Sequence, residues 1–313
     1  MKAVYHPSYQ VVLPPGHPFP MSKYSLLKDQ LLAEGTLAPD DLLQPEPLDL
    51  ASLSLVHTSE YLAKLSSAGL SATEQRRLGL PWSEALWQRS LLASAGTLLA
   101  AREALSRGLA GNLAGGTHHA FAGHGEGFCV LNDVAIAIRR LQLERAIRRA
   151  AVIDLDVHQG NGTAAIFETD NEVFTFSMHG ARNYPLAKMR SNLDVALNDG
   201  VGDVGYLGKL RQHLPAVLDA ANAEVVFYLA GVDVAAGDRY GKLDLTEQGI
   251  RQRDRAVIEA VRGRGLPLVI VLAGGYAPTR ARTAELHAHV FREAMAYERE
   301  DAKQSEPRSA AVR

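Results

Sequence analysis

Three long apolar runs limit what this chain can fold into. They span residues 150–154, 224–229 and 266–272, and glycine or an acidic residue stands at or soon after the end of each. Continuous apolar runs of this length are typical of strands buried on both faces. Helix-like stretches cover residues 86–107, 132–143 and 246–262. The alternation predicts an α/β fold, with a parallel sheet between helices on both faces.

The chain shows no internal repeat and no clear linker, so we expect one domain over residues 1–300. Residues 301–313 are polar and lack apolar periodicity, which predicts a disordered C-terminal tail. Residues 180–206 are rich in turn formers and are interpreted as a long loop. Such a loop is either a functional rim or a plain connector.

Composition narrows the function classes. The net charge of -2 and the pI near 6.6 give no basic field, so nucleic-acid binding is not expected. No apolar run approaches the ~20 residues that span a bilayer, and no apolar leader follows Met1, so we expect a cytoplasmic protein without a membrane partner. The single cysteine, Cys129, fits a reducing compartment and is interpreted as a buried thiol.

Polar groups follow two of the predicted strands. Asp156 and His158 alternate in the segment after residue 154, so an extended backbone would project both to one side. Asp233 follows the second strand, at the edge where open α/β sheets bind ligands. Asp-X-His alone more simply forms a cap or turn. With Asp233, two carboxylates and one imidazole leave an open position, the arrangement of a catalytic zinc site.

Two further motifs offer catalytic groups. His118 and His119 follow two glycines, and histidine is the side chain best suited to proton transfer near neutral pH. Tyr276 follows a glycine pair after the third strand, where its phenol could donate a hydrogen bond to an oxyanion. In isolation, the first motif would be a polar loop and the second an ordinary turn.

Taken together, these motifs resemble the histone deacetylases and related acyl-amine hydrolases over roughly residues 4–291. The most specific segments, in family order, are 115–120, 127–133, 154–162, 231–241 and 274–276. The segments 17–19 and 56–58 and the His-Gln-Gly-Asn-Gly sequence from His158 are most similar to class IV. The resemblance implies the arginase/deacetylase fold, a single three-layer domain with an eight-stranded parallel sheet. It also implies an amidohydrolase that releases a carboxylate from N-acyl-lysine, or from small acylated amines such as acylpolyamines.

Residue roles also follow from the resemblance. It implies that Asp156, His158 and Asp233 bind one zinc ion per chain, with iron(II) as an alternative. His119 would act as general base and acid, and His118 would tune the charge beside it. Asp154 would hydrogen-bond to His118, Asn161 would hydrogen-bond to His119, and Tyr276 would polarise the acyl carbonyl.

The resemblance also implies a substrate-binding site and a monovalent-cation site. Phe128 and Tyr184 would form the walls of a channel for the lysine-like chain. The full set of expected substrate-binding residues is Gly127, Phe128, Tyr184, Gly274 and Gly275. A monovalent cation, K⁺ or Na⁺, would lie at Asp154, Ser177 and the backbone of Met178.

Two alternatives are weighed against this interpretation. The dinuclear manganese relatives, arginase and agmatinase, carry extra carboxylates where this chain has Gly160 and Ala235, so a single metal is favoured. A non-catalytic acyl-lysine-binding scaffold should have lost a ligand, the histidine pair or the tyrosine, and none is missing.

Many relatives carry an acidic residue at the channel rim, but this chain has Leu-Gly-Leu-Pro at residues 78–81. The identity of the acylated substrate therefore stays open.

Overall fold

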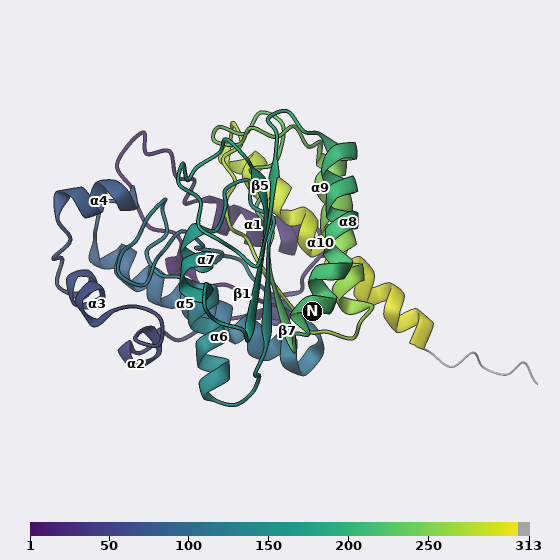
Figure 1. The fold of residues 1–313 in the computed structure, drawn as a ribbon, viewed down its shortest axis with the longest axis horizontal. Helices are drawn as coiled ribbons and strands as arrows, with labels where there is room; N and C mark the ends of the chain where they lie inside the picture. Colours follow the sequence, from purple (N-terminus) through teal and green to yellow (C-terminus); the bar gives the residue numbers. More distant parts are fainter. Residues whose placement is uncertain (306–313) are drawn as a thin grey trace, which may run out of the picture.

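The computed structural model describes residues 1–305 and is built around one eight-stranded sheet in which all neighbouring strands are parallel. The strand order is β2-β1-β3-β8-β7-β4-β5-β6. Helices cover both faces of the sheet, which confirms the predicted three-layer α/β fold (Figure 1). The strands are β1 (Lys2–Val4), β2 (Leu42–Leu43), β3 (Leu109–Asn112), β4 (Ala150–Asp154), β5 (Val173–Gly180), β6 (Leu193–Leu197), β7 (Val225–Leu229) and β8 (Leu268–Val271).

The central strands β4, β7 and β8 are buried along their whole length. Successive side chains point to opposite faces of a strand, so each strand contributes to two cores. Ala150 and Val152 belong to one apolar cluster, and Ala151 and Ile153 belong to the other. This two-sided burial explains why the strands appear in the sequence as continuous apolar runs.

The helices form one layer on each face. The first core packs against α5 (Glu84–Arg107), α6 (Asp133–Leu143) and α7 (Asn161–Phe167). The second core packs against α1 (Lys23–Ala33), α8 (Asp203–Ala221), α9 (Glu247–Arg262) and α10 (Arg280–Ser305). The short helices α2 (Leu50–Leu53), α3 (Ser59–Ser66) and α4 (Ala72–Leu78) lie beyond α5 in Figure 1.

Two expectations need correction. Residues 180–206 are not one loop, because they contain β6 and the start of α8. Leu193, Val195 and Leu197 alternate with Asp194 and Ala196, both exposed, which is the period-two pattern of an edge strand. The expected disordered tail, residues 301–313, does not begin at residue 301. Helix α10 continues through residues 301–305, which include good helix formers that extend an already packed helix, and residues 306–313 lie outside the described part.

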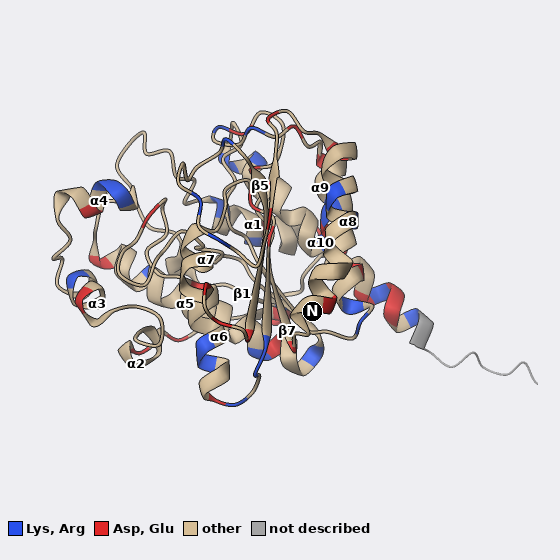
Figure 2. Ribbon diagram, in the orientation of Figure 1, with Lys and Arg blue, Asp and Glu red and all other residues tan. Residues whose placement is uncertain are grey.

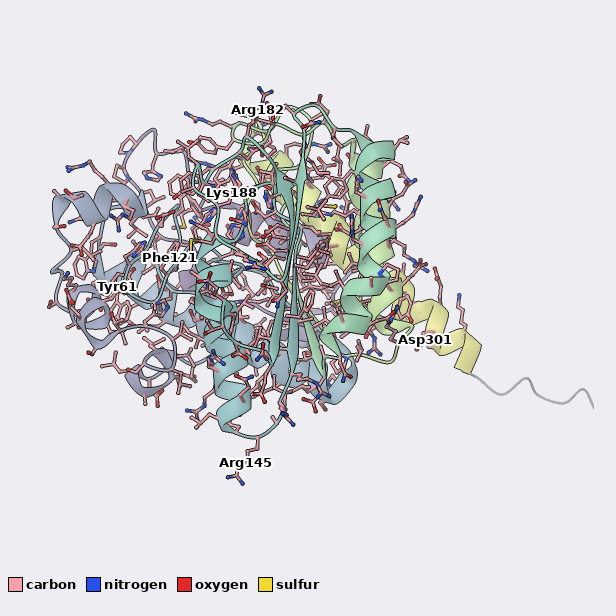
Figure 3. All side chains as sticks on the ribbon, in the orientation of Figure 1. Tyr61, Phe121, Arg145, Arg182, Lys188 and Asp301 are labelled. Carbon is pink, nitrogen blue, oxygen red and sulfur yellow. The ribbon has the colours of Figure 1, made fainter. Side chains whose placement is uncertain are left out.

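Different basic residues lie at the carboxyl and amino ends of the strands. Arg182 and Lys188 lie in the loop after β5, at the carboxyl edge, whereas Arg145 lies before β4 at the opposite edge (Figure 3). Basic and acidic residues are interspersed over the outer helices (Figure 2).

Within residues 1–305, no helix is both long and apolar enough to cross a membrane.

One buried carboxylate connects the fold to the histidine pair. Asp133, the first residue of α6, accepts hydrogen bonds from the Thr97 hydroxyl (2.6 Å) and from the backbone N–H groups of Gly116 (3.0 Å) and Thr117 (2.8 Å). A carboxylate at this position also interacts favourably with the N-terminal end of the helix dipole. Asp133 thereby anchors the backbone that leads into His118.

We therefore expect Asp133→Ala to lower the free energy of unfolding by about 3 kcal/mol, because it leaves buried donors without an acceptor. Urea unfolding measures the change. The control is Asp219→Ala, which removes an exposed carboxylate with only a surface ion pair and should change stability by less than about 0.5 kcal/mol. Equal effects of the two substitutions would show that Asp133 is not an anchor.

Candidate metal centre and catalytic residues

Asp156, His158 and Asp233 meet at the carboxyl edge of the sheet, as the sequence predicts. Asp156 and His158 lie in the loop after β4, and Asp233 lies in the loop after β7. One ligand atom from each lies within 4.8 Å of the others. His158 Nδ1 is 2.9 Å from Asp156 Oδ1 and 3.3 Å from Asp233 Oδ2. The two aspartates are 0 % exposed and the histidine 8 %, so the group is shielded from bulk water.

The backbone around these side chains orients the carboxylates. The N–H of Val157 donates to Asp233 Oδ1 (2.9 Å), and the N–H of Gly274, after β8, donates to Asp156 Oδ2 (2.6 Å). A Cβ at Gly274 would lie 2.0 Å from Asp233 Oδ2, so only glycine allows this approach. Loops after three adjacent strands thus converge on one point.

The residues present fit a divalent metal ion. Asp233 Oδ2 is buried and accepts no hydrogen bond within the described residues. Burial and the neighbouring Asp156 carboxylate raise the pKa of Asp233 to about 7. Burial alone would lower the pKa of His158, but Asp156 and Asp233 outweigh it and raise this pKa to about 10. Two buried carboxylates around one imidazole thus form an acidic group whose negative charge a bound cation would balance.

The two adjacent histidines have different partners. His118 Nδ1 is 2.7 Å from Asp154 Oδ2, and His119 Nδ1 is 2.7 Å from Asn161 Oδ1, the pairs that the resemblance implies. Burial lowers the pKa of His118, but the charge of Asp154 outweighs it and raises the value to about 9. Burial, together with the positive charges of His118 and His158, lowers the pKa of His119 well below its usual value.

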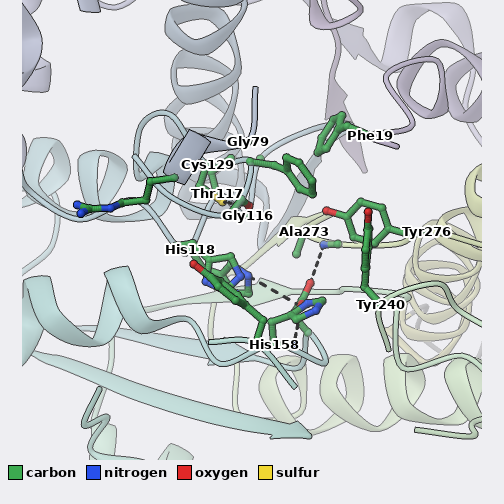
Figure 4. A pocket seen from close by; sticks show the side chains of 18 of the residues that line it. Phe19, Gly79, Gly116, Thr117, His118, Cys129, His158, Tyr240, Ala273 and Tyr276 are labelled. Carbon is green, nitrogen blue, oxygen red and sulfur yellow. Dashed lines mark hydrogen bonds and ion pairs between the residues drawn. The ribbon is translucent and has the colours of Figure 1, made fainter. Parts of the chain in front are cut away.

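One cavity of about 360 Å³ is lined by His118, His119, Asp156 and His158. Tyr276 and Tyr240 lie on one side, His118 lies on the other, and His158 lies between them (Figure 4). Burial and the charges of Asp233 and Asp156 raise the pKa of Tyr276 well above its usual value, so its hydroxyl keeps its proton. The cavity is therefore lined by a histidine with a lowered pKa, a protonated phenol and two of the three candidate metal ligands.

Known proteins match this chain over almost its whole length. A family model described as histone deacetylase domain matches residues 17–293. The chain belongs to the histone deacetylase family. It is 34% identical to Histone deacetylase 2 of Arabidopsis thaliana over 276 residues, covering 85% of this chain and 71% of the relative. An uncharacterized protein of Picosynechococcus sp. is 48% identical over 274 residues, covering 88% of this chain and 91% of that protein.

Other matches agree with this assignment. A probable deacetylase of Archaeoglobus fulgidus is 30% identical, with 84% of this chain and 77% of that protein covered. The crystal structure of the HDA15 HD domain has the same fold, with a TM-score of 0.78 and 21% identity, covering 97% of this chain and 93% of that one. Relatives that are deacetylases support hydrolysis of amides by this chain. The class IV branch stays a prediction from the motifs.

Most substrate-site residues that the deacetylase resemblance implies reach the cavity. Gly127, Phe128, Tyr184 and Gly274 all line it. Gly275 does not: it is buried, and a Cβ there would meet Val232 and His287 instead. Gly275 therefore supports the backbone between Gly274 and Tyr276 and is not a wall of the cavity.

The residues expected to bind a monovalent cation do not line the cavity. Asp154 and Ser177 are register partners at the ends of β4 and β5, and Met178 follows Ser177. This placement brings the expected monovalent-cation residues together, while the cation itself stays a prediction. Cys129 borders the cavity, but burial raises the pKa of its thiol, so it is not an activated nucleophile.

Sequence reasoning missed several residues at the cavity. Phe19, Arg76, Arg77 and Tyr240 line it, and Glu126 contacts two of the expected site residues. Tyr240 stands in the family-like segment 231–241 and packs next to Tyr276, at a ring distance of 4.9 Å, so that segment was a usable signal. No sequence pattern pointed to Arg76, Arg77 or Glu126 as part of the site, because their placement depends on contacts between distant segments.

We expect Asp156→Ala, His158→Ala and Asp233→Ala each to lower bound zinc below one ion per chain, because each removes one of three ligands. Metal analysis after dialysis measures occupancy. Zinc should also raise the melting temperature of the wild type, since a ligand that binds only the folded state stabilises it. Asp170→Ala, which removes an aspartate paired with Arg139 away from the cavity, should behave as wild type. Full occupancy in all three ligand variants would exclude this site.

Proposed function

We propose that this protein is a zinc-dependent deacylase that releases a carboxylate from N-acyl-lysine or related acylated amines. One observation carries the proposal: two of the three candidate metal ligands, Asp156 and His158, line the same cavity as His119 and Tyr276. Asp156, His158 and Asp233 would hold the ion. A divalent ion bound there would polarise the acyl carbonyl and lower the pKa of an attacking water.

His119 is the proposed proton carrier. Its Nδ1 is engaged by Asn161, which leaves Nε2 as the nitrogen available to the cavity. A lowered pKa keeps this ring neutral, so it can accept the proton of the attacking water. The ring then donates that proton to the departing amine as the carbon–nitrogen bond breaks. The products are a carboxylate and a free amine.

Tyr276 is the proposed donor to the carbonyl oxygen. Its backbone N–H donates to Asp238 Oδ2 (2.6 Å), and its ring packs against Tyr240, which together fix the phenol on one side of the cavity. A protonated phenol in this place would stabilise the negative charge that develops on the oxygen. Phe128 and Tyr184 would flank the methylenes of the acylated chain.

Neither alternative function is favoured by the geometry of the cavity. A Cβ at Gly160 would lie 2.3 Å from Asp154 Oδ2, so a carboxylate ligand for a second metal does not fit there without a change in that contact. A scaffold that binds acyl-lysine without hydrolysis would not need His119 or Tyr276 at the cavity. Measuring zinc content and hydrolysis of an acyl-lysine peptide on the same preparation distinguishes enzyme from scaffold.

We expect Tyr276→Phe to retain its zinc and its fold but to lower kcat by roughly 10²–10³, the usual cost of losing one donor to an oxyanion. Steady-state kinetics with an acyl-lysine peptide and metal analysis test both parts. The comparison variant is Tyr297→Phe, on α10 at a site away from the cavity lining, which should keep wild-type kinetics. A kcat for Tyr276→Phe within a few-fold of wild type would refute this role.

The rim of the cavity carries positive charge. Gly79, in the segment without an acidic residue, lines the cavity, as do Arg76 and Arg77 at the end of α4. Both arginine side chains are exposed, and neither forms an ion pair within the described residues. We propose that this rim favours acyl-lysine with acidic neighbours and disfavours cationic acylpolyamines, because like charges repel at short range.

An acetyl-lysine peptide with flanking aspartates should therefore exceed its lysine-flanked counterpart in kcat/KM by about tenfold at low salt, with the ratio falling as salt is added. Replacing both arginines, Arg76→Ala with Arg77→Ala, should bring the ratio close to one. Arg145→Ala is the matched control, because Arg145 lies at the opposite edge of the sheet (Figure 3). A ratio unchanged by the double substitution would remove the rim from substrate selection.

A further inference from the structure

Glu126 is held beside the cavity by a tight turn. Its N–H donates to the carbonyl of Cys129 (3.1 Å), and the N–H of Cys129 donates back to the carbonyl of Glu126 (2.8 Å). The two residues between them, Gly127 and Phe128, have φ angles of 54° and 69°. Two positive φ angles in a two-residue connection are the signature of a type I′ hairpin turn. The turn therefore fixes Glu126 next to the wall residue Phe128.

The Glu126 carboxylate contacts two residues that lie next to His119, namely Asn161 and Tyr184. Oε1 accepts a hydrogen bond from Asn161 Nδ2 (2.9 Å) and another from the Tyr184 hydroxyl. Oε2 lies 3.5 Å from His124 Nε2. The side chain is only 17% exposed, so these bonds are made largely away from bulk water. Burial would raise the pKa of Glu126, but these hydrogen bonds outweigh it and lower the pKa to about 2, so the group is a carboxylate.

A carboxylate at this place determines which way the Asn161 amide faces. An ionised carboxylate only accepts hydrogen bonds, so the amide must present its NH₂ group to Glu126. Its oxygen then faces His119 Nδ1, at 2.7 Å. An oxygen only accepts, so His119 must carry its proton on Nδ1 and its lone pair on Nε2. This is the tautomer that a general base at the cavity requires.

We propose that Glu126 is a positioning residue that fixes the orientation of the Asn161 amide and thereby the tautomer of His119. The expected effect on catalysis rests on the proposed function, whereas the effect on the His119 tautomer does not. Without Glu126, the Asn161 amide can rotate and present NH₂ to His119. The imidazole would then carry its proton on Nε2 and could not accept one from water.

The direct test is the tautomer itself. In zinc-loaded protein labelled with ¹⁵N-histidine, the His119 ring signals are identified by their loss in His119→Gln. The wild type should show the neutral ring protonated on Nδ1, and Glu126→Ala should shift the ring toward the Nε2-protonated form. Glu224→Ala, which removes a glutamate at the opposite edge of the sheet, should leave the spectrum unchanged. Identical His119 signals in Glu126→Ala and wild type would overturn the proposal, whether or not the protein hydrolyses acyl-lysine.

Kinetics separate this role from simple support of the channel wall. Glu126→Ala should lower kcat by about ten- to a hundredfold, since correct protonation of a general base is worth roughly 10²–10⁴, while KM changes little. If Glu126 acted only by holding the Tyr184 ring in place, Tyr184→Phe, which keeps the ring, would reproduce the whole loss of activity seen in Glu126→Ala. The loss would then appear as a higher KM. That result would overturn the proposal.

A charge exchange gives the sharpest comparison. Asn161→Asp would place two carboxylates face to face, at a position where the present N···O distance is 2.9 Å. Adding Glu126→Gln restores a donor–acceptor pair, because the new amide at position 126 donates to the new carboxylate at position 161, which still accepts from His119. We therefore expect Glu126→Gln to lower kcat in the wild type and to raise it in Asn161→Asp. Equal proportional losses in both backgrounds would show that Glu126 is merely structural.

Discussion

Two carboxylates buried side by side are the constraint around which this structure is arranged. Asp156 and Asp233 are both 0 % exposed, and both contact the same nitrogen of His158. Such a pair is costly without compensating positive charge and hydrogen bonds. The compensation comes from loops after neighbouring strands: the His158 ring after β4, and N–H groups of Val157 after β4 and Gly274 after β8. The parallel register of β4, β7 and β8 is therefore what brings the three candidate metal ligands together.

The histidine pair is under a similar electrostatic constraint. The rings of His118 and His119 are 4.1 Å apart, too close for both to hold a positive charge comfortably inside the protein. Asp154 gives His118 a charged partner, whereas Asn161 gives His119 a neutral one. Asp154 therefore raises the pKa of His118, while burial and the charge of His118 lower the pKa of His119. Separated pKa values of this kind suit chemically identical groups to different roles.

The sequence predicted what depends on local patterns. Residues 150–154 match β4 residue for residue, and Asp156, His158 and Asp233 meet because ligands that follow parallel strands share one edge. Prediction failed where spacing along the chain carries no information. Glu126 contacts residues 35 and 58 positions away, and Arg76 and Arg77 reach the cavity only through the placement of α4. Strand β6 was missed for another reason, since exposed residues alternate with its apolar ones and it lies inside a polar segment.

The turn at residues 126–129 connects the Phe128 wall of the cavity to the residues around His119. A positive φ at Phe128 is costly for a residue with a side chain, and such strain persists only where the surroundings enforce it. Here the N–H groups of Gly127 and Phe128 donate to the carbonyls of Arg77 and Leu78, which ties the turn to the end of α4. A Cβ at Gly127 would lie 2.7 Å from His119 Cδ2, so the turn also packs directly on that ring. One hairpin thus positions the aromatic wall, contacts the proposed proton carrier and presents Glu126 to Asn161. Because the four residues form one hydrogen-bonded unit, the channel wall cannot shift without also moving the groups that orient His119.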